Sequence, residues 1–463
     1  MESPRPPLLM AGPLPPARNG IADYAAALLG ALSAEYDCFA ACEDWLAEAP
    51  PGVRVVDPAL AHRLPLGGRV LHQLGNNPDH GFVLRLLRRL PGVVVLHDPG
   101  LLHLHESTGE ARETILAGMR HAAPRLAATY ARHLREEGFS TRANHLLFDL
   151  AGEVLVRSTA VVVHSRFAAR RLALTHGAAA AAHVAVIPHL LPPGPLPDRA
   201  AARARLGIGE GEFLVVTAGF AAAAKRLDWV LAALEGLPGM RWIHAGGVPP
   251  ALAPRLAGRA QVTGHLEEAA LADHIAAADA LVNLRFPSLG ESSGILARGL
   301  AAGTPCLVSD TAAYAELPRE AVLHLPLAGG AVALAEALAA LRAAPERRAA
   351  LGAAGRRHAE AEMALSVIAA RYAEVIEAAR DRPPAPPPEP VLLRLRPDRA
   401  GIAVALSGRA GPCRLLIEAE PASLVTLSLA PEGLPAALLP PEALLRAVSW
   451  RPDGLLLDIS LPG

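Results

Sequence analysis

The sequence predicts an α/β protein with two domains, each built on a mainly parallel sheet wrapped by helices, and a small β-rich module after them. Its 463 residues are too many for one ordinary hydrophobic core. Short apolar segments alternate with longer helical ones, which is the pattern of parallel sheets covered by helices. A proline-rich run, Arg382–Pro390, then separates a C-terminal stretch of short alternating segments.

Short apolar segments between polar loops predict the buried strands of both domains. In the first domain they are Leu8–Met10, Arg69–His72, Val93–Leu96, Val161–Val163 and Val184–Ile187. In the second domain they are Phe213–Thr217, Trp242–His244, Ala280–Leu284 and Cys306–Val308.

The segments between and after these strands set the expected domain limits. We expect the first domain over residues 1–190 and the second over 200–380, joined by a Pro- and Gly-rich hinge at Leu190–Asp198. The other expected parts are a charged helical excursion over 106–157, two closing helices over Ala331–Arg380, a linker over 381–390 and the β-rich module over 391–463.

Composition excludes several classes of protein. Hydrophobic residues make up 52% of the chain but aromatic residues only 4%, and no stretch approaches the roughly 18 uninterrupted apolar residues of a membrane-spanning helix. No secretory signal pattern opens the chain, so we expect a cytoplasmic protein. A net charge of −1 gives no general attraction to nucleic acid. The four cysteines lack the spacing of a zinc site or a disulfide framework, and we expect buried free thiols.

The segment Asp279–Pro318 carries the most informative pattern. After an apolar strand, a loop with Arg285 and Glu291 leads into a helix that begins near Ser292–Gly294. Open α/β sheets bind ligands at such carboxyl ends of strands. The amide groups and dipole of a helix start suit a diphosphate, whereas Glu291 suits a sugar hydroxyl. The alternative is that Glu291 and Ser292 only cap the helix.

A second pattern lies in Thr217–Asp228, where a strand and a loop of small residues precede Lys225 and Arg226. These two cations are expected to open a helix, where they oppose its dipole. An anion bound at the same place would explain them. The alternative is a pair of solvated surface cations.

Polar residues also follow a strand of the first domain. His97 and Asp98 come directly after Val93–Leu96, and an imidazole there can hydrogen-bond a sugar hydroxyl or help to move a proton. In another loop, Gly20 allows a ligand to approach the backbone closely, although plain turn chemistry is the alternative.

A metal site is the other use for histidines in this region. His103 and His105 form a His-x-His pair beside the acidic Glu106, but no third ligand at suitable spacing is evident. We therefore expect no metal ion and no other cofactor.

Taken in order, these segments resemble the family 4 glycosyltransferases, retaining enzymes whose GT-B fold has two Rossmann-like domains facing a cleft. The resemblance covers roughly residues 5–375. It is strongest to a branch with six elements, which here read Gly75–Pro78 with His80, Val94–Asp98, Lys225–Arg226 with Asp228, Asn283–Arg285 with Pro287, Gly290–Gly294 and Ala315–Pro318.

The resemblance implies roles for these residues. It implies that the second domain binds a nucleotide-sugar, with Lys225 on the diphosphate and Glu291 on the transferred sugar and phosphate. It places His97 over the sugar and Gly20 at the floor of the cleft, and it implies that no metal is bound. The predicted site residues are catalytic Glu291, His97 and Lys225, with Gly20, Asp98, Arg226, Arg285, Ser292, Ser293, Gly294 and Ile295 binding substrate.

Two positions depart from the family pattern. Phe220 replaces an arginine that commonly lies five positions before the phosphate-binding lysine, and Arg226 is the candidate replacement. Gly299 replaces a glutamate that would hold the ribose, and no substitute is evident in the sequence.

We therefore expect a retaining glycosyltransferase that moves a hexose, with mannose as one candidate, to a glycan or lipid-linked acceptor. The setting expected from the family is polysaccharide or lipid-linked glycan assembly. A peripheral membrane contact through residues 106–157 stays open. The alternatives are a non-catalytic nucleotide-sugar-binding scaffold and a GT-B sugar-nucleotide epimerase.

Overall fold

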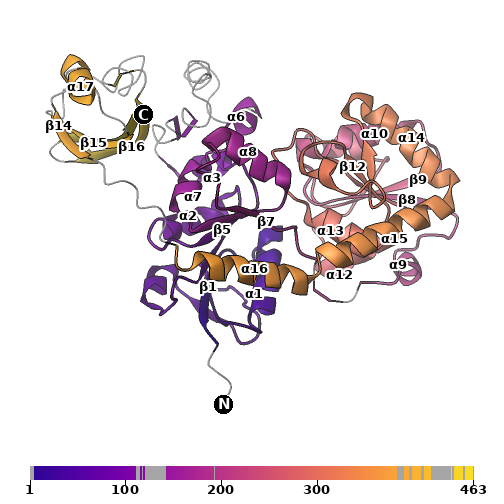
Figure 1. Cartoon of the computed structure of the whole chain (residues 1–463). Coiled ribbons are helices and arrows are strands. Elements are labelled where there is room, and N and C mark those ends of the chain that lie inside the picture. The colour runs from indigo at the N-terminus through magenta and orange to yellow at the C-terminus, as the bar shows by residue number, and fades with distance from the viewer. Residues whose placement is uncertain are drawn as a thin grey trace. The chain divides into compact units, whose positions relative to one another are not determined.

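The strands of the protein form three sheets in a computed structural model (Figure 1). The structure describes residues 5–110, 115–116, 118–119, 142–191, 193–194, 196–382, 391–395, 399–407, 411–418, 439–440, 443–451 and 454–461. By its internal contacts the chain divides into two compact units. Unit 1 holds residues 1–66, 162–170 and 185–377, and unit 2 holds 67–161, 171–184 and 378–463.

The first sheet has seven strands in the order β3-β2-β1-β4-β5-β6-β7. The strands are β1 (Pro7–Ala11), β2 (Asp37–Ala41), β3 (Arg54–Val56), β4 (Val70–Leu74), β5 (Val93–Leu96), β6 (Ala160–Val163) and β7 (Val184–Val186). β1 pairs with β2 in parallel, and β4 with β5 likewise. The central strands β4, β5 and β6 are buried along their whole length, and β5 and β6 are wholly apolar, as expected where helices cover both faces of a parallel sheet.

Helices connect these strands. They are α1 (Gly20–Leu32), α2 (Gly81–Leu87), α3 (Leu102–Ser107), α6 (Arg142–Leu147), α7 (Gly152–Arg157) and α8 (Arg166–His176), with short 3₁₀ turns η1 (Pro58–Arg63) and η2 (Pro78–His80). α1 begins where the Asn19 side chain accepts a hydrogen bond from the amide of Ala22 at 2.8 Å.

The second sheet has six strands in the order β10-β9-β8-β11-β12-β13. They are β8 (Phe213–Ala218), β9 (Met240–Ala245), β10 (Gln261–Val262), β11 (Ala280–Asn283), β12 (Cys306–Ser309) and β13 (Leu323–Leu325). The helices are α9 (Arg199–Arg205), α10 (Leu227–Glu235), α11 (Ala253–Leu256), α12 (Glu268–Ala277), α13 (Gly294–Ala301), α14 (Gly330–Ala343), α15 (Pro345–Glu362) and α16 (Leu365–Ala379). Three 3₁₀ turns are η4 (Ala223–Lys225), η5 (Ala312–Glu316) and η6 (Leu327–Gly329).

Alternate residues of β8 face two separate cores, one on each side of the second sheet. Leu214 and Val216 pack with residues of α9, α12, α13 and α15. Phe213 and Val215 pack with residues of α10, α11 and α14. This two-sided burial explains why β8 is an uninterrupted apolar run, and it fixes the strand whose carboxyl end leads to Lys225.

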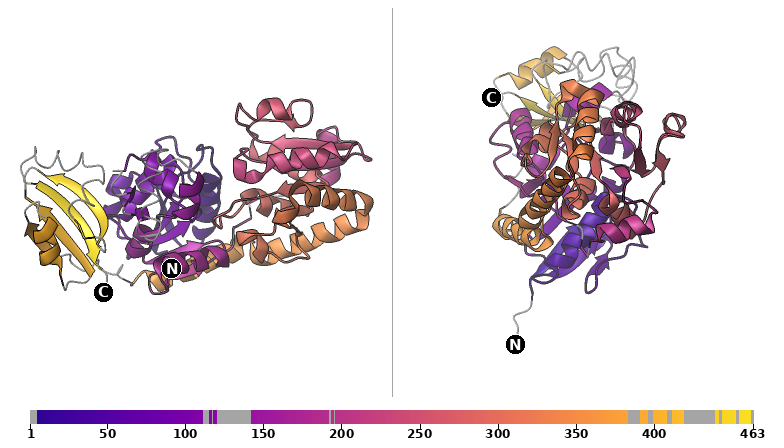
Figure 2. Two further views of the ribbon diagram at one scale, coloured as in Figure 1. Left: turned by 90° about the horizontal axis from the view of Figure 1, so that it is seen from above. Right: turned by 90° about the vertical axis from the view of Figure 1, so that its right-hand side faces the viewer.

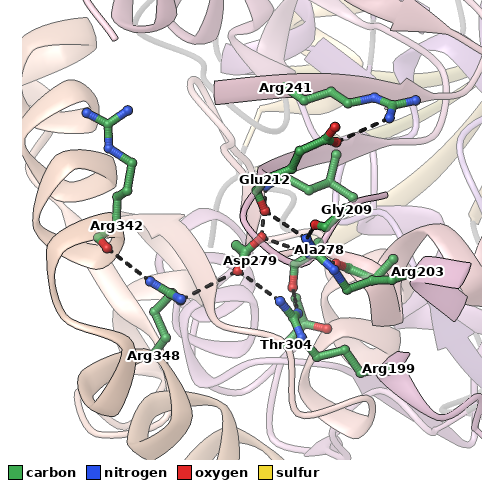
Figure 3. Close-up of polar contacts among 12 residues, drawn as sticks. Arg199, Arg203, Gly209, Glu212, Arg241, Ala278, Asp279, Thr304, Arg342 and Arg348 are labelled. Carbon is green, nitrogen blue, oxygen red and sulfur yellow. Dashed lines mark hydrogen bonds and ion pairs between the residues drawn. The ribbon is translucent and has the colours of Figure 1, made fainter. Parts of the chain in front are cut away.

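A buried carboxylate ties several elements together just before β11 (Figure 3). Asp279 is 4% exposed and accepts hydrogen bonds from Arg199 at 2.8 Å and from Arg203 at 3.0 Å. Arg348, at the start of α15, lies 3.6 Å from the same side chain. The amide of Leu214 donates to it at 2.8 Å. One carboxylate therefore joins α9, β8 and α15.

Unit 1 also contains a contact between its first helix and its last. The hydroxyl groups of Tyr24 on α1 and Tyr372 on α16 are 2.8 Å apart and buried. The rings of His164 and His189 lie 5.5 and 5.0 Å from that of Tyr24. Burial lowers the pKa of both histidines, to about 4 for His164 and about 3 for His189. Both are therefore neutral packing partners at ordinary pH.

The C-terminal module is a twisted four-stranded sheet in the order β14-β15-β17-β16, with one helix (Figure 2). Its elements are β14 (Val391–Leu395), α17 (Arg399–Leu406), β15 (Gly411–Ile417), β16 (Leu444–Arg451) and β17 (Gly454–Leu461). β14 and β15 are parallel, whereas β17 is antiparallel to both of its neighbours. Odd-numbered residues of β15 and β17 form one apolar core with α17.

These observations confirm the predicted fold class of two parallel-sheet α/β domains and a small β-rich module. All of the predicted strands are present, and the four cysteines are free and buried. The prediction of two helices over 331–380 is wrong, because the segment forms three helices, α14, α15 and α16. The helical structure is interrupted just before Pro345 and again after Glu362. Most of the 106–157 excursion and of the 381–390 linker lies outside the described residues.

Among the described residues, no single helix combines the length and apolar composition needed to cross a membrane. One helix pair bent by 105°, Leu327–Ala343 with Pro345–Ala379, meets those two criteria together, by length and composition only.

Candidate active site

The two loops singled out by the sequence follow neighbouring strands of the second sheet. β8 pairs in parallel with β11, so their carboxyl ends lie at the same edge. The amide of Phe286, in the loop after β11, donates to the carbonyl of Ala224 in the loop after β8 at 2.8 Å. A Cβ atom placed on Gly219 would lie 2.6 Å from Lys225 Nζ and 3.9 Å from Ile295 Cγ1. The lysine and the first turn of α13 therefore converge on Gly219.

Lys225 is held in an electrostatically unbalanced position. Its Nζ donates to the carbonyl oxygen of Ala218 at 2.9 Å, and no carboxylate in the described part of the chain forms an ion pair with it. Burial lowers its pKa to about 7, and the nearby positive charge of Arg285 adds to the effect. A bound anion would supply the missing countercharge. Lys225 is also the only lysine among the 44 lysine and arginine residues of the chain.

Arg226 has a different environment. Its backbone is left-handed, with φ of 52°, and α10 begins only at Leu227. The expectation that Lys225 opens this helix is therefore wrong, because the lysine lies in the preceding turn η4. The Arg226 guanidinium donates to Asp228 at 2.6 Å and lies 4.4 Å above the ring of Trp229. In this conformation its charge is already paired.

Ser293 caps the helix that follows the Glu291 loop. Its Oγ accepts from the amide of Leu296 at 3.3 Å and donates to Asn283 Oδ1 at 2.9 Å. The alternative in which Glu291 and Ser292 serve as the caps is therefore wrong. The earlier amides of α13 have no acceptor within the helix. Asn283 Nδ2 is buried and lacks a hydrogen-bond partner among the described residues.

Replacing Ser293 with alanine should lower the free energy of unfolding by about 1–2 kcal/mol, because the cap is lost and the buried Asn283 loses its partner. Chemical denaturation of the purified variant measures this change. Ser292→Ala is the matched control, and its effect should stay within about 0.5 kcal/mol. Equal losses in the two variants would contradict the assignment of the cap.

Glu291 is oriented by its own loop. Its Oε2 accepts from the hydroxyl of Ser288 and the amide of Leu289, both at 2.9 Å. Gly290, with φ of 106°, lies so close to Phe167 that a Cβ would be 2.8 Å from the ring. Only glycine fits this backbone without strain. The loop is thereby fixed with Glu291 partly exposed beside the start of α13.

Gly20 lies at the first position of α1, in unit 1 together with the second sheet. A Cβ placed on it would meet no atom within 4 Å, so there is open space beside its backbone. One turn later, burial raises the pKa of Asp23, while the positive charge of Arg298 on α13 opposes the shift. Asp23 therefore lies within electrostatic reach of Arg298.

His97 and Asp98 belong to unit 2, where they join two of the predicted motifs. His97 is 8% exposed, and its Nε2–H donates to Gln73 Oε1 at 2.8 Å. The amide of Asn76 donates to Asp98 Oδ2 at 3.0 Å. Asn76 Oδ1 in turn accepts from the amide of Leu104 at 2.9 Å. The loops after β4 and β5 therefore form one hydrogen-bonded group around His97.

Position 299 cannot carry a ribose-binding side chain in this fold. Gly299 is buried, and a Cβ there would lie 2.2 Å from Leu281 and 2.8 Å from Cys306 Sγ. The side chain of the preceding residue, Arg298, donates to both carboxylate oxygens of Glu268 at 2.8 and 2.9 Å. The departure noted in the sequence is thus a core-facing position of this helix.

Sequence reasoning missed three buried polar residues beneath Lys225. Trp242 Nε1 donates to Thr217 Oγ1 at 3.0 Å, and Thr217 Oγ1 lies 2.9 Å from His244 Nδ1. Burial lowers the pKa of His244 to about 4, with the charge of Lys225 as a further cause. A neutral His244 adds no second charge near the lysine. The signal that could have found this group is the occurrence of Thr and His within otherwise apolar strands.

His103, His105 and Glu106 all lie on α3. Among the described residues, no group of three or more histidine, cysteine, aspartate or glutamate side chains could hold a metal ion. Glu106 instead lies 3.5 Å from His145 Nε2.

The sequence and fold of this protein were compared with those of known proteins. Residues 225–374, which include Lys225, Glu291 and all of α13, match a family described as glycosyl transferase-like. None of the curated proteins compared matches the chain.

Solved structures that cover 80–82% of the chain share its fold at low sequence identity. Sucrose-phosphate synthase from Thermosynechococcus elongatus is 20% identical with a TM-score of 0.58, covering 81% of this chain and 99% of that one. Anabaena HepE in complex with UDP-glucose is 14% identical, with a TM-score of 0.55 and coverages of 80% and 99%. Starch synthase IV from Arabidopsis thaliana, bound to ADP and acarbose, is 12% identical, with a TM-score of 0.56 and coverages of 82% and 100%. The match of residues 225–374 to that family and the GT-B fold together support the prediction of a glycosyltransferase enzyme.

Proposed function

We propose that the protein transfers a hexose from a nucleotide-diphosphate sugar to a hydroxyl group of a glycan or lipid-linked acceptor, with retention of configuration. The observation that carries this proposal is the convergence of Lys225 and the start of α13 on Gly219. There a partly buried cation without a carboxylate partner meets the positive end of a helix dipole. A diphosphate would balance both.

The reaction follows from where charge develops. The acceptor oxygen attacks the anomeric carbon while the bond from that carbon to the phosphate oxygen breaks. The departing phosphate gains negative charge, which Lys225 and the opening amides of α13 would stabilise. That phosphate oxygen takes the proton of the acceptor hydroxyl, on the same face of the sugar. Because side chains and amides supply the positive charge, we propose that no metal ion takes part in the reaction.

The remaining residues have positioning roles in this proposal. Glu291, held by Ser288 and Leu289, would accept hydrogen bonds from hydroxyl groups of the transferred sugar. Gly20 would border the sugar through the open space beside it. His97, oriented by Gln73, would contact the sugar from the first sheet. Similar structures are complexes with UDP, UDP-glucose and ADP, which supports a nucleotide-sugar donor.

A turnover assay tests this function. A thermal-shift panel of UDP-, ADP- and GDP-sugars first selects the donor, and release of free nucleotide is then followed with and without candidate acceptors in the presence of a chelator. Acceptor-dependent release is the expected result. Binding without release would favour a scaffold, whereas interconversion of the sugar without release would favour an epimerase.

A further inference from the structure

Phe220 is an exposed aromatic ring directly beside the proposed diphosphate site. It follows Gly219, the residue on which Lys225 and Ile295 converge, and it is 63% exposed. No aromatic ring or guanidinium group in the described part of the chain packs on it. By contrast Phe286, the other exposed ring near this site, stacks on Trp229 with centroids 6.4 Å apart. A large apolar surface is thus held in solvent at the edge of the sheet where a ligand is expected.

The backbone on either side of Phe220 is fixed. The amide of Gly219 donates to the carbonyl of Ala245, and that of Ala221 donates to the carbonyl of Gly247, both at 2.9 Å. A Cβ on Gly246 would lie 2.4 Å from the carbonyl oxygen of Gly219, so the two loops touch through glycine. The ring of Phe220 therefore projects from a rigid base, and does not belong to a mobile loop.

The position of the ring in the sheet indicates what it could contact. β8 lies between β9 and β11. Lys225 and α13 define the anion site on the β11 side, whereas Phe220 leans toward β9, with Cδ2 3.6 Å from a Cβ placed on Gly247. The loop after β9 reads Gly246–Pro250 and carries no charged side chain. A ligand that extends from the anion site toward β9 thus leaves the cations and meets a neutral, apolar surface.

We propose that Phe220 stacks against the base of the nucleoside diphosphate whose phosphates lie at Lys225. This inference rests on the proposed function and names the part of the donor that the ring holds. A nucleobase is a neutral, flat, polarisable ring, and aromatic side chains bind it through a π-face that every base possesses. Phe220 therefore contributes affinity for the nucleoside with little preference among bases, and discrimination among bases comes from other groups.

Titration calorimetry with UDP, ADP and inorganic pyrophosphate tests the proposal on the full-length protein, on Phe220→Ala and on Phe220→Trp. The alanine variant should bind UDP and ADP about tenfold or more weakly, as expected for loss of one stacked base. Its affinity for pyrophosphate should change less than twofold. The tryptophan variant should keep the affinity, and its added fluorescence should be quenched by UDP but not by pyrophosphate. Phe286→Ala is the matched control and should leave all three affinities unchanged.

Three other results would contradict the proposal, and they can be told apart. An equal loss for pyrophosphate and nucleoside diphosphates would mean that Phe220 only shapes the anion site. Unchanged affinities in Phe220→Ala would mean that the ring does not touch the nucleoside, with the anion site intact. If the unaltered protein bound neither pyrophosphate nor nucleoside diphosphate, both the stacking and the proposed function would be overturned. Thermal unfolding of each variant verifies folding, which an exposed position should preserve.

Discussion

Replacing Asp279 with alanine should lower the free energy of unfolding by about 3–5 kcal/mol, the cost of breaking a buried ion pair by removing one partner. The carboxylate is 4% exposed and is contacted by Arg199, Arg203 and Arg348. Its removal leaves three guanidinium groups facing one another without a counterion. It also leaves the amide of Leu214, at the start of the central strand β8, without its acceptor.

Urea denaturation followed by circular dichroism measures this loss, and Asp273→Ala is the matched control. Asp273 pairs with Arg205, whose side chain is 53% exposed. An exposed pair of this kind contributes about 0–1 kcal/mol. A loss of less than 1 kcal/mol for Asp279→Ala would show that the three arginine side chains can rely on their hydrogen bonds to backbone carbonyl groups. It would contradict the conclusion that Asp279 joins α9, β8 and α15.

Lys225→Ala should lower kcat/KM for sugar transfer at least tenfold, which corresponds to roughly 1.4 kcal/mol of transition-state stabilisation. The ammonium group lies where the proposed leaving phosphate develops charge, and no second lysine exists to replace it. The variant should fold normally, because it removes a partly buried cation that pairs with no carboxylate among the described residues. Ordinary turnover in a folded Lys225→Ala protein would exclude Lys225 from the site.

The same lysine should make donor binding depend on pH. Its pKa in the free protein is about 7, and a bound diphosphate favours the charged form and raises that value. The complex then holds more protons than the free protein above pH 7, so affinity should be highest below pH 7 and fall by up to tenfold per pH unit above it. A nucleotide-sugar is the suitable ligand, since its diphosphate does not titrate in this range.

An independent readout of this titration uses the single lysine. The rate of acetylation of Lys225, followed by mass spectrometry of its peptide, should reach half its maximum near pH 7 and shift to higher pH when the donor is bound. In Lys225→Met the dependence of affinity on pH should disappear. A free lysine that reacts with an ordinary midpoint near 10 would contradict the electrostatic description of the site.

The apolar runs made most of the sheet architecture predictable from the sequence. Segments such as Val93–Leu96 and Phe213–Thr217 are buried on both faces, so composition alone distinguishes them. The edge strands β3 and β10 are short and exposed, and nothing in their composition separates them from loops. The division between α15 and α16 was missed because alanine-rich helical segments look alike on either side of a break.

For the candidate site, the sequence indicated which residues take part better than it indicated which residues they contact. The sequence indicated that Lys225 and the α13 start follow parallel strands, but only the pairing of β8 with β11 makes them neighbours. Identifying Ser293 as the cap required the position of Asn283, which is ten residues away in sequence. The contacts of Arg226 with Asp228 and Trp229 depend on the left-handed backbone conformation of Arg226, which no local sequence pattern predicts.

The close contact between Gly219 and Gly246 constrains how this protein could be redesigned. A methyl group at position 246 would overlap the carbonyl of residue 219, so the two loops pack directly against each other. Replacing residues 219–226 with the corresponding segment of an enzyme that uses another donor should therefore disrupt the packing of the two loops. Exchanging residues 245–247 at the same time should avoid this. Directed evolution of new donors in this scaffold would accordingly select paired changes in the two loops over single substitutions in either one.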